Sequence, residues 1–512
     1  MCKSGYFKLI CLLFLLIIYP TKLNAYRERD YLWVANSDGY VDKSLLIEFT
    51  IRTGRQIIIT APRRFMKSTN LDMLCKFFSV ESLHDVEVFQ TFRQTLIYKN
   101  KAVFDEHFAK YPVVYVDFKC GGVNTFKDAL SQIRTCINEA YRLHPYLEKS
   151  SYLLGEERDL FVRWRYVFGY TEMLVWEIQA SLSQLVDMLE KHHNHKVVVL
   201  VDQYDCLNNE ALYRVESDED FKKILSLTSA VLSNVVNNHN VKFALMVGTS
   251  YISSSFDSPL NVVRRYNFMD ERSVQSLFSF TSNELKTVFS TDHLYFGYMC
   301  RNKRIIFNPY SVLRYMRMRK SESFWTDMSF TTQFMSLLKF PVIEKCVEDL
   351  LSLKAIQSDL IKMITAEDVL HLRGVMRGTI NSEPSVDLFL TLLMDYGFLS
   401  YCVQDQSEYR KDFKMKVKLP NREIEKELMY HYVDFYVRDG MNIKGVDEMN
   451  YLKVKPLIDN YKKNKPFEIR KFVTNLWNLV KRWFASVFFT TNFRVQPYGP
   501  NPEIERPDPE SV

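Results

Sequence analysis

The chain has 512 residues, of which 47% are hydrophobic and 25% charged, and its formal net charge is +6. This balance is typical of globular domains and excludes a largely disordered, collagen-like or coiled-coil protein. At about 150 residues per domain, the length predicts three domains, or two with extensions.

The amino terminus has the pattern of a secretory signal peptide. Lys3 and Lys8 precede an apolar run at residues 9–19, which is shorter than the ~20 residues of a membrane span. Removal of residues 1–25 takes away three lysines and no acid, so the net charge falls by three, from +6 to +3. We therefore expect a secreted, extracellular protein with no transmembrane segment after cleavage; an uncleaved anchor is the alternative.

The mature chain would keep seven cysteines that are spread over the whole sequence. They are Cys75, Cys120, Cys136, Cys206, Cys300, Cys346 and Cys402. No CxxC pair occurs, so a zinc ribbon is not expected, and the spacing specifies no disulfide pairing. The pattern favours an intracellular type of fold that is sent through the secretory route.

Four short apolar runs in the first half predict strands, at residues 56–60, 113–118, 197–202 and 241–248. The runs are continuous rather than alternating, which indicates strands buried on both faces of a parallel sheet. Stretches with apolar residues at helical spacing lie between them, at residues 70–78, 126–141 and 172–190. Alternating strands and helices predict an α/β fold with a doubly wound sheet.

The second half predicts mostly helices, at residues 282–289, 311–318, 330–338, 344–364 and 387–394. Two strands at residues 396–401 and 413–419 predict a hairpin, so a winged-helix-like unit is expected here. Residues 450–494 carry ten Lys and Arg against two acids and form a basic, aromatic helical pattern. The Pro-rich, acidic end predicts disorder.

The loop after the first strand, APRRFMKST at residues 61–69, has the layout of a phosphate-binding loop. Free backbone N–H groups at a helix start attract phosphate, Lys67 would neutralise it, and the Ser68 hydroxyl would ligate Mg²⁺. Ala61 and Met66 stand where G-x-x-x-x-G-K-[ST] has its glycines. A non-glycine residue in a left-handed conformation costs about 1–3 kcal/mol. The alternative is a basic strand-to-helix turn without a ligand.

The third strand ends in Asp202, followed by Gln203, Tyr204 and Asp205. An apolar strand that ends in an acid is the Walker B arrangement, in which Asp202 would hold Mg²⁺ through water. The next position usually carries a glutamate that activates the attacking water, and Gln203 cannot accept that proton; loss of a general base typically lowers the rate by about 10²–10⁴-fold. The alternative for Asp202 is an acid that caps a turn or a helix.

The ordered series of motifs resembles the predicted AAA-ATPase-like family of P-loop proteins, over roughly residues 31–425, in the form of its secreted, insect-type members with degenerate Walker motifs. The stretches that carry the resemblance lie at residues 40–44, 61–71, 112–118, 200–205, 308–313, 324–325, 396–399 and 419–424. The resemblance implies a P-loop AAA-ATPase-like domain at residues 26–275, a helical lid at 276–343 and a winged-helix-like region at 344–435. After these we expect the basic aromatic tail at 436–494 and the disordered end at 495–512.

The resemblance assigns Lys67, Ser68 and Asp202 to a nucleotide and its magnesium, and so implies Mg²⁺-ATP as the cofactor. Arg63 and Arg64 are predicted phosphate clamps or arginine fingers, with a solvated basic turn as the alternative, and Thr69 completes the predicted nucleotide-binding set.

Two further groups of residues could belong to a site. Thr249 and Ser250 end the fourth strand, where a residue that senses the nucleotide would lie. His192, His193 and His195 lie in a polar connector and are not expected to bind metal.

We expect a secreted, degenerate nucleotide-binding protein with little or no ATP hydrolysis. Its status as an enzyme stays open, and no catalytic residue is assigned beyond Gln203 at the position of the catalytic acid. The alternative is a secreted interaction protein that keeps the fold without a nucleotide and binds an unknown protein partner. A nucleic-acid-binding protein that uses the basic tail is the least favoured alternative.

Overall fold

The computed structural model describes residues 29–37, 39–54, 56–254, 259–286, 297–318, 335–402 and 415–442. The predicted signal peptide, the Phe324-Trp325 pair, most of the basic tail and the predicted disordered end lie outside these residues. The chain divides into two units, Met1–Phe435 and Tyr436–Val512, and the description below concerns the first.

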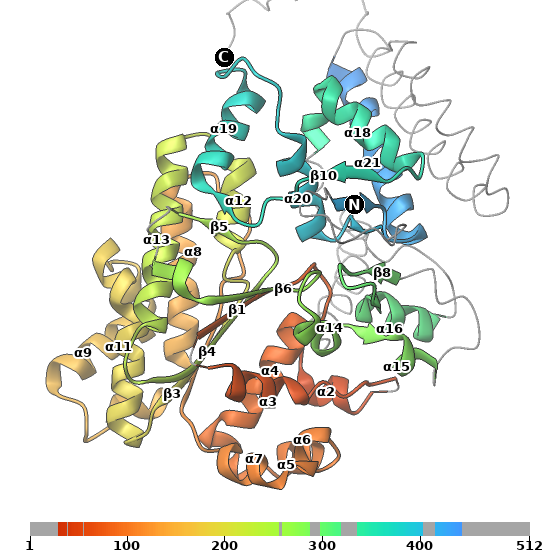
Figure 1. Cartoon of the computed structure of the whole chain (residues 1–512). Coiled ribbons are helices and arrows are strands. Elements are labelled where there is room, and N and C mark those ends of the chain that lie inside the picture. The colour runs from red at the N-terminus through yellow and green to blue at the C-terminus, as the bar shows by residue number, and fades with distance from the viewer. Residues whose placement is uncertain are drawn as a thin grey trace, which may run out of the picture. The chain divides into compact units, whose positions relative to one another are not determined.

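A five-stranded parallel sheet forms the centre of this unit (Figure 1). Its strands are β1 (Gln56–Thr60), β2 (Val113–Asp117), β3 (Val197–Asp202), β4 (Val241–Gly248) and β6 (Arg264–Asn267), in the order β2-β3-β4-β1-β6. The four predicted strands are confirmed to within one residue, and so is the α/β fold class. The fifth strand, β6, was not predicted because it lies at the sheet edge and its sequence, RRYN, carries no apolar run.

Helices cover both faces of the sheet, as parallel strands require (Figure 1). One face is covered by α3 (Leu45–Thr53) and α4 (Lys67–Phe78), and the other by α8 (Phe126–Arg142), α11 (Val175–His193) and α13 (Asp218–Val236). The remaining helices of this part are α2 (Tyr31–Ala35), η1 (Val80–His84), α5 (Val86–Arg93), α6 (Leu96–Lys99), α7 (Lys101–His107), η2 (Pro145–Lys149), α9 (Gly155–Arg165), α10 (Val167–Tyr170) and α12 (Cys206–Arg214). The three predicted helices correspond to α4, α8 and α11.

A small second layer follows the sheet. It comprises β5 (Ile252–Ser253), η3 (Pro259–Val262), α14 (Arg272–Phe278), β7 (Phe280–Thr281), α15 (Ser282–Lys286), β8 (Gly297–Met299), β9 (Ile305–Phe307) and α16 (Pro309–Met318). Phe280, Leu285, Phe307 and Val312 form its apolar core. The buried Lys43 ammonium pairs with Glu284 of α15 at 2.7 Å, which ties this layer to the start of α3.

The last part consists of η5 (Met335–Lys339), α18 (Pro341–Leu351), β10 (Ile356–Ser358), β11 (Ile364–Thr365), α19 (Ala366–Arg377), α20 (Val386–Tyr396), β12 (Ser400–Tyr401), β13 (Met415–Lys418) and α21 (Arg422–Asn442). β10, β13 and β12 form an antiparallel sheet in that order. The described portion thus contains both helical and small antiparallel regions after the parallel sheet.

The predicted helix at residues 344–364 is wrong, because α18 ends at Leu351 and the chain then enters β10. Pairing of β10 with β13, which lies far along the chain, overrides the local helical pattern. The antiparallel pairing of the predicted hairpin is confirmed by β12 and β13, but its first strand was expected to begin too early. Residue 396 still belongs to α20, and Gly397, with φ of 87°, ends that helix. Of the predicted helix at 330–338, the structure describes only the short η5.

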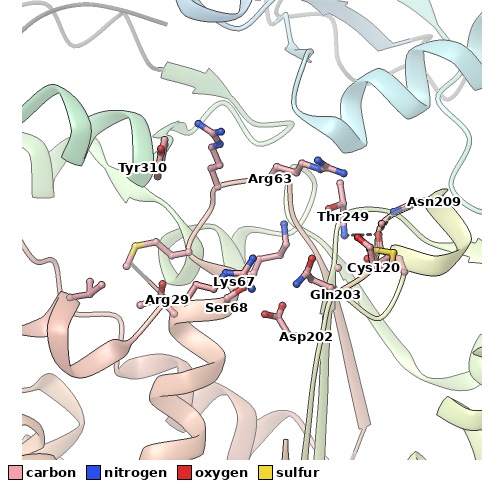
Figure 2. Close-up of a pocket in the computed structure, with 18 of the residues that line it drawn as sticks. Arg29, Arg63, Lys67, Ser68, Cys120, Asp202, Gln203, Asn209, Thr249 and Tyr310 are labelled. Carbon is pink, nitrogen blue, oxygen red and sulfur yellow. Dashed lines mark hydrogen bonds between the residues drawn. A yellow bond between two sulfur atoms is a disulfide. The ribbon is translucent and has the colours of Figure 1, made fainter. Parts of the chain in front are cut away.

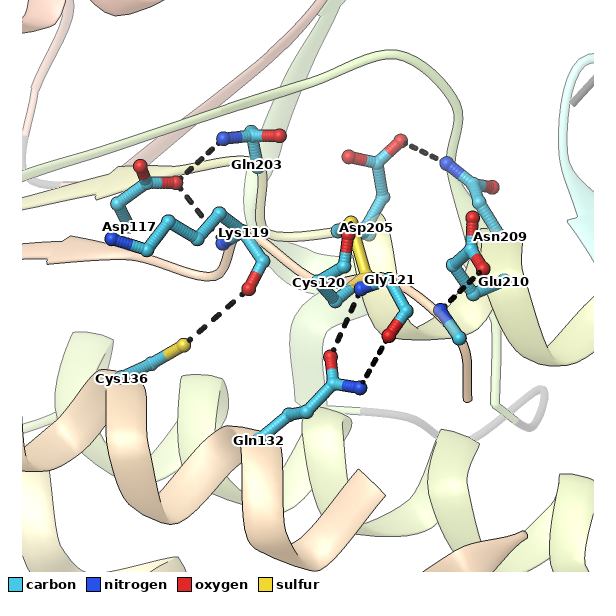
Figure 3. The surroundings of a disulfide bond; sticks show 12 residues. Asp117, Lys119, Cys120, Gly121, Gln132, Cys136, Gln203, Asp205, Asn209 and Glu210 are labelled. Carbon is cyan, nitrogen blue, oxygen red and sulfur yellow. Dashed lines mark hydrogen bonds between the residues drawn. A yellow bond between two sulfur atoms is a disulfide. The ribbon is translucent and has the colours of Figure 1, made fainter. Parts of the chain in front are cut away.

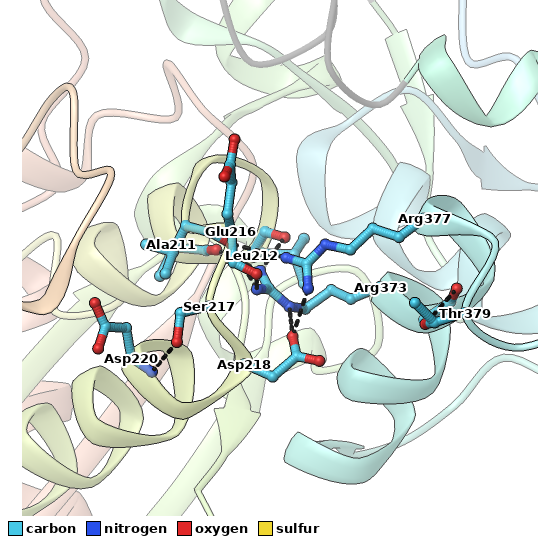
Figure 4. Close-up of polar contacts among 11 residues, drawn as sticks. Ala211, Leu212, Glu216, Ser217, Asp218, Asp220, Arg373, Arg377 and Thr379 are labelled. Carbon is cyan, nitrogen blue, oxygen red and sulfur yellow. Dashed lines mark hydrogen bonds and ion pairs between the residues drawn. The ribbon is translucent and has the colours of Figure 1, made fainter.

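Arg373 of α19 connects this last part to the sheet domain (Figure 4). Its guanidinium is 2% exposed and donates to the carbonyl oxygens of Ala211 and Leu212, at 2.8 and 2.9 Å, and to Asp218 at 2.9 Å. The last carbonyl groups of a helix lack partners within the helix and carry a partial negative charge, so a buried cation stabilises the end of α12. The start of α12 lies beside the site described next.

No helix in the described residues combines the length and apolar character needed to cross a lipid bilayer.

Candidate functional site

A cavity of about 590 Å³ lies at the carboxyl ends of β1, β3 and β4 (Figure 2). Its lining includes all five predicted nucleotide-binding residues together with Asp202, Gln203 and Thr249. The register of the sheet pairs Asp117 with Asp202, and Thr60 with Gly248, so the strands end at one level. Ligands of open parallel sheets bind at this edge, and the volume is ordinary for a small-molecule site.

The phosphate loop runs from Ala61 to Met66, and α4 begins at Lys67. Arg64 and Met66 have φ of 67° and 53°, so both adopt the left-handed conformation that glycine normally fills. The Met66 side chain packs against the cluster of Phe280 and Phe307, and Phe65 is fully buried against Phe268 and Tyr298. Apolar contacts therefore hold a loop whose backbone is strained.

Lys67 lies at the amino terminus of α4 and folds back over its own loop. Its ammonium donates to the carbonyl oxygens of Ala61 and Pro62, at 2.6 and 2.8 Å. Burial lowers the pKa of Lys67 to about 8, while the nearby carboxyls of Asp205 and Asp202 act in the opposite direction. An ammonium has three hydrogens, and two of them are used here, so one is left for an anion.

Asp202 is the last residue of β3 and is fully buried. By hydrogen-bond distance and angle, neither of its carboxylate oxygens has a partner among the residues that the structure describes, although the Ser68 hydroxyl lies close enough to lower its pKa. Ser68, near the start of α4, lines the same cavity (Figure 2). Burial raises the pKa of Asp202 to about 6, with a further rise from the charge of Asp117, whereas Ser68, Arg29 and Lys67 lower it.

Such a buried carboxylate without partners is costly unless a cation or a proton satisfies it. Together with a serine hydroxyl it forms an oxygen donor set of the kind that Mg²⁺ prefers. The residues present therefore fit a magnesium ion. The sequence-based alternative, in which Asp202 caps a turn or a helix, does not describe this geometry, because the Asp202 carboxylate accepts no backbone N–H group among the described residues.

Asp205 holds the end of β4 in place. Its Oδ2 accepts the backbone N–H groups of Thr249 and Ser250, both at 2.8 Å, and the side chain of Asn209 at 2.7 Å. A Cβ atom at Gly248 would lie 2.5 Å from the Asp205 carboxyl, so this approach requires glycine. The predicted sensor pair thus contacts the Walker B segment, and only Thr249 of the two lines the cavity.

Sequence reasoning missed Asp117 and Arg29. Gln203 Nε2 donates to Asp117 Oδ1 at 2.6 Å, and the Arg29 guanidinium pairs with the other Asp117 oxygen at 3.3 Å. Burial raises the pKa of Asp117, while Arg29 and Gln203 lower it. The signal that would have found Asp117 is its place at the end of the second apolar run, as Asp202 ends the third.

Sequence reasoning also left the disulfides open, and the structure joins Cys120 to Cys206 (Figure 3). Their Cα atoms are 6.0 Å apart and 86 residues separate them in the chain. Cys120 lies just after β2 and Cys206 is the first residue of α12, and both line the cavity. The bond connects the loop after β2 to the turn that carries Gln203.

The opposite wall of the cavity is aromatic and basic. The Arg64 guanidinium lies over the Tyr310 ring at 4.4 Å, and Arg317 of α16 lies over Trp33 of α2 at 5.0 Å. Arg63 also lines the cavity, whereas Thr69 lines it from a buried position on α4. The solvated-turn alternative for Arg64 does not fit its contact with Tyr310.

The histidines lie elsewhere. His192 contacts the Ser150 hydroxyl at 2.8 Å and His193 the Tyr146 hydroxyl at 3.1 Å. Burial lowers the pKa of both imidazoles. Within the described ranges, no three His, Cys, Asp or Glu side chains gather as metal ligands.

The fold and the cavity define a P-loop type of α/β domain, with a lysine at a helix start facing an acid at a strand end. Residues 32–255 match the family model described as "Predicted AAA-ATPase", and this segment contains Lys67, Ser68, Asp202 and both bridged cysteines. The matched segment is therefore an AAA-ATPase-like domain. Residues after 255, to which the resemblance was also extended, lie outside this match.

One curated relative is similar over a longer stretch. It is the "Uncharacterized protein in vnfD 5'region" of Azotobacter chroococcum mcd 1, with 22% identity over 315 residues. These cover 58% of this chain and 52% of the relative, so the match spans about half the length of that protein. No solved structure matches this chain.

Proposed function

We propose that the cavity binds a nucleoside triphosphate with Mg²⁺ and hydrolyses it slowly or not at all. The observation that carries this proposal is the buried Asp202 carboxylate, which lacks a hydrogen bond of regular geometry among the described residues and lines the same cavity as Lys67 and Ser68. The match of residues 32–255 to the predicted AAA-ATPase family supports the same ligand.

Each residue has a separate task in this proposal. The first N–H groups of α4 and the Lys67 ammonium attract the phosphates, and Asp202 and Ser68 hold the metal. The metal, when bound, supplies charge neutralisation between phosphate oxygens. Arg63, Arg64 and Thr69 surround the phosphates from the loop side.

Slow hydrolysis is proposed because the residue after Asp202 is an amide. Gln203 cannot accept a proton from water, and its Nε2 is already bonded to Asp117. The side chain of Met66, at a left-handed position that glycine normally fills, further limits how closely a phosphate approaches the loop. A degenerate nucleotide-binding protein is the function that these features favour.

Secretion is the second part of the proposal. The signal-peptide pattern of residues 1–25 supports it. The Cys120–Cys206 disulfide supports it independently, because such bonds persist in oxidising compartments and are rare in the cytosol.

A thermal-shift titration with nucleotide tests the proposal. ATP with Mg²⁺ at 100-fold excess over its Kd should stabilise the full chain by about 2.7 kcal/mol. Lys67→Ala should abolish the rise in melting temperature, because the cation at the phosphates is lost. Lys76→Ala is the matched control: it lies on the same helix, pairs with Asp72 and does not line the cavity.

The absence of any shift in melting temperature at millimolar nucleotide would contradict nucleotide binding and favour the interaction protein.

A specific observation supports the interaction protein as a second candidate function. Large apolar side chains are exposed on α9 to α11, including Phe168, Leu154 and Trp176, at 94%, 68% and 62%. Exposed apolar patches of this kind often bind other proteins. The nucleic-acid alternative rests on the basic tail, which lies outside the described residues.

A further inference from the structure

The carboxylate that is missing at position 203 is present on the neighbouring strand. Asp117 ends β2, Asp202 ends β3, and the two residues are register partners in the sheet. Gln203 follows Asp202 with φ of 54°, a left-handed conformation that turns its side chain toward β2. The resulting contact, Gln203 Nε2 to Asp117 Oδ1, is 2.6 Å long (Figure 3).

We propose that Asp117 and Gln203 form an exchanged carboxylate–amide pair, with the carboxylate at the end of β2 and the amide after Asp202. In this pair, Asp117 is a positioning residue that directs the Gln203 carbonyl oxygen toward the nucleotide. This inference rests on the proposed function and adds a residue to it. It also explains why a left-handed backbone is kept at a position occupied by glutamine.

The contacts of Asp117 fix its orientation. Its Oδ1 accepts the Lys119 N–H at 3.1 Å in addition to the Gln203 amide, and its Oδ2 pairs with Arg29 at 3.3 Å. With both oxygens held, the carboxylate is a stationary acceptor at the edge of the cavity. Arg29 and Gln203 line the cavity and Asp117 does not, so Asp117 acts through Gln203 rather than on the ligand itself.

Amide chemistry then determines where the Gln203 oxygen points. An ionised carboxylate only accepts hydrogen bonds, so the NH₂ group of Gln203 must face Asp117. Oε1 lies at the other end of the amide group, away from Asp117 (Figure 3), and Gln203 lines the cavity. A glutamine oxygen in such a place accepts a hydrogen bond from water and orients it, as in other nucleoside triphosphatases.

The reaction that this water would undergo is an in-line displacement. Its oxygen forms a bond to the terminal phosphorus, and the bond from that phosphorus to the bridging oxygen breaks. The electron pair of the broken bond leaves with the nucleoside diphosphate, and the water proton ends on the released phosphate. Gln203 contributes orientation without taking the proton, which accords with slow turnover.

The structure and the sequence lead to opposite predictions for the activity of one variant, Gln203→Glu. The sequence suggests that Gln203→Glu restores the catalytic acid. In the structure this change places two carboxylates at hydrogen-bond distance, and their repulsion would displace the new glutamate. Activity should return only when Asp117 becomes the amide, as in Asp117→Asn combined with Gln203→Glu.

The test measures single-turnover ATP hydrolysis and nucleotide affinity of the full chain in the parent and three variants. We expect the double variant to exceed the parent by about 100-fold, the lower end of the range for a general base. The Gln203→Glu variant should gain at least tenfold less than the double variant. Gln203→Glu with Glu139→Gln is the matched control, since it removes a nearby acid that pairs with Lys119 and leaves Asp117 intact; it should not reproduce the gain.

Equal gains in hydrolysis rate in the Gln203→Glu variant and the double variant would overturn the inference. A double variant that binds nucleotide but hydrolyses it no faster than the parent would overturn it as well. If Asp117→Asn impairs folding, Asp117→Ser with Gln203→Glu removes the same charge and should show the same pattern. Absence of nucleotide binding in every variant, the parent included, would instead overturn the proposed function. Nucleotide binding without the larger rate gain in the double variant would overturn only the role of Asp117.

Discussion

Two corners of the cavity are built in opposite ways. The phosphate-loop corner, residues 61–69, is held by apolar side chains: Phe65 is fully buried, and Met66 packs on the core of the second layer. The acidic corner, residues 117–121 and 202–206, is held by polar contacts and a disulfide.

The difference in construction concerns which groups of a phosphate-binding site are present at each corner. At the loop, glycine positions have been replaced by residues that contribute packing, while Lys67 and Ser68 remain at the helix start. At the acidic corner, Asp202 ends β3 and the next residue is an amide, Gln203, which is bonded to Asp117. In the proposed function, both corners thus supply groups for phosphate and its metal, whereas the amide at position 203 concerns the attacking water.

Removal of the disulfide should have the largest effect on this comparison. The bond closes a segment of 86 residues, and loss of such a link typically lowers the free energy of unfolding by about 2–5 kcal/mol. We expect this loss in Cys120→Ser combined with Cys206→Ser, measured by denaturant unfolding. A reductant should lower the stability of the parent and leave that of the variant unchanged. Cys75→Ser, at an unpaired cysteine, is the control. Insensitivity of the parent to reductant would contradict a stabilising bond at the acidic corner.

Asp202→Asn should have the next largest effect, and it should raise the free energy of unfolding rather than lower it. The pKa of Asp202 is raised from 3.8 to about 6, so the folded state binds the proton more tightly than the unfolded state. The resulting destabilisation grows as the pH rises from 3.8 to 6 and is complete above 6. The variant without nucleotide should therefore be more stable than the parent by about 1–3 kcal/mol at pH 7.5, and by less at pH 5.

The same substitution should remove the Mg²⁺ dependence of nucleotide affinity. In the parent, this affinity should decline below pH 6, where Asp202 is protonated, and above pH 8, where Lys67 loses its charge. Calorimetric titration from pH 5 to 9 measures both limits. An affinity that is flat over this range would contradict the assignment of the two residues to the ligand.

Substitution of Met66 should have the smallest effect and tests the other corner. Met66→Ala loses the apolar contacts and keeps the left-handed strain, whereas Met66→Gly loses the contacts and relieves the strain. Glycine should therefore be the more stable of the two by about 1 kcal/mol in thermal or denaturant unfolding. The reverse order would show that residue 66 is not left-handed in solution.

The sequence was sufficient for four of the five strands of the central sheet and for several of the residues at its edge. It did not specify the order of the strands, but the last residues of the four apolar runs, together with the loop around Lys67, meet where parallel strands end. Prediction failed at β6 and β10, because both are short and depend on strand pairing rather than on their own composition. It failed in the same way at residues 344–364, where local helical spacing continues past the end of α18.

The amino-acid sequence by itself determined that this chain has a parallel α/β core with a lysine and an acid at its edge, since both follow from local hydrophobic pattern and strand order. Only the tertiary structure decided the partners of Gln203, Met66 and Cys120, which are Asp117, the second-layer core and Cys206. These contacts join segments up to about 240 residues apart, and no local pattern specifies which side chains folding will bring together.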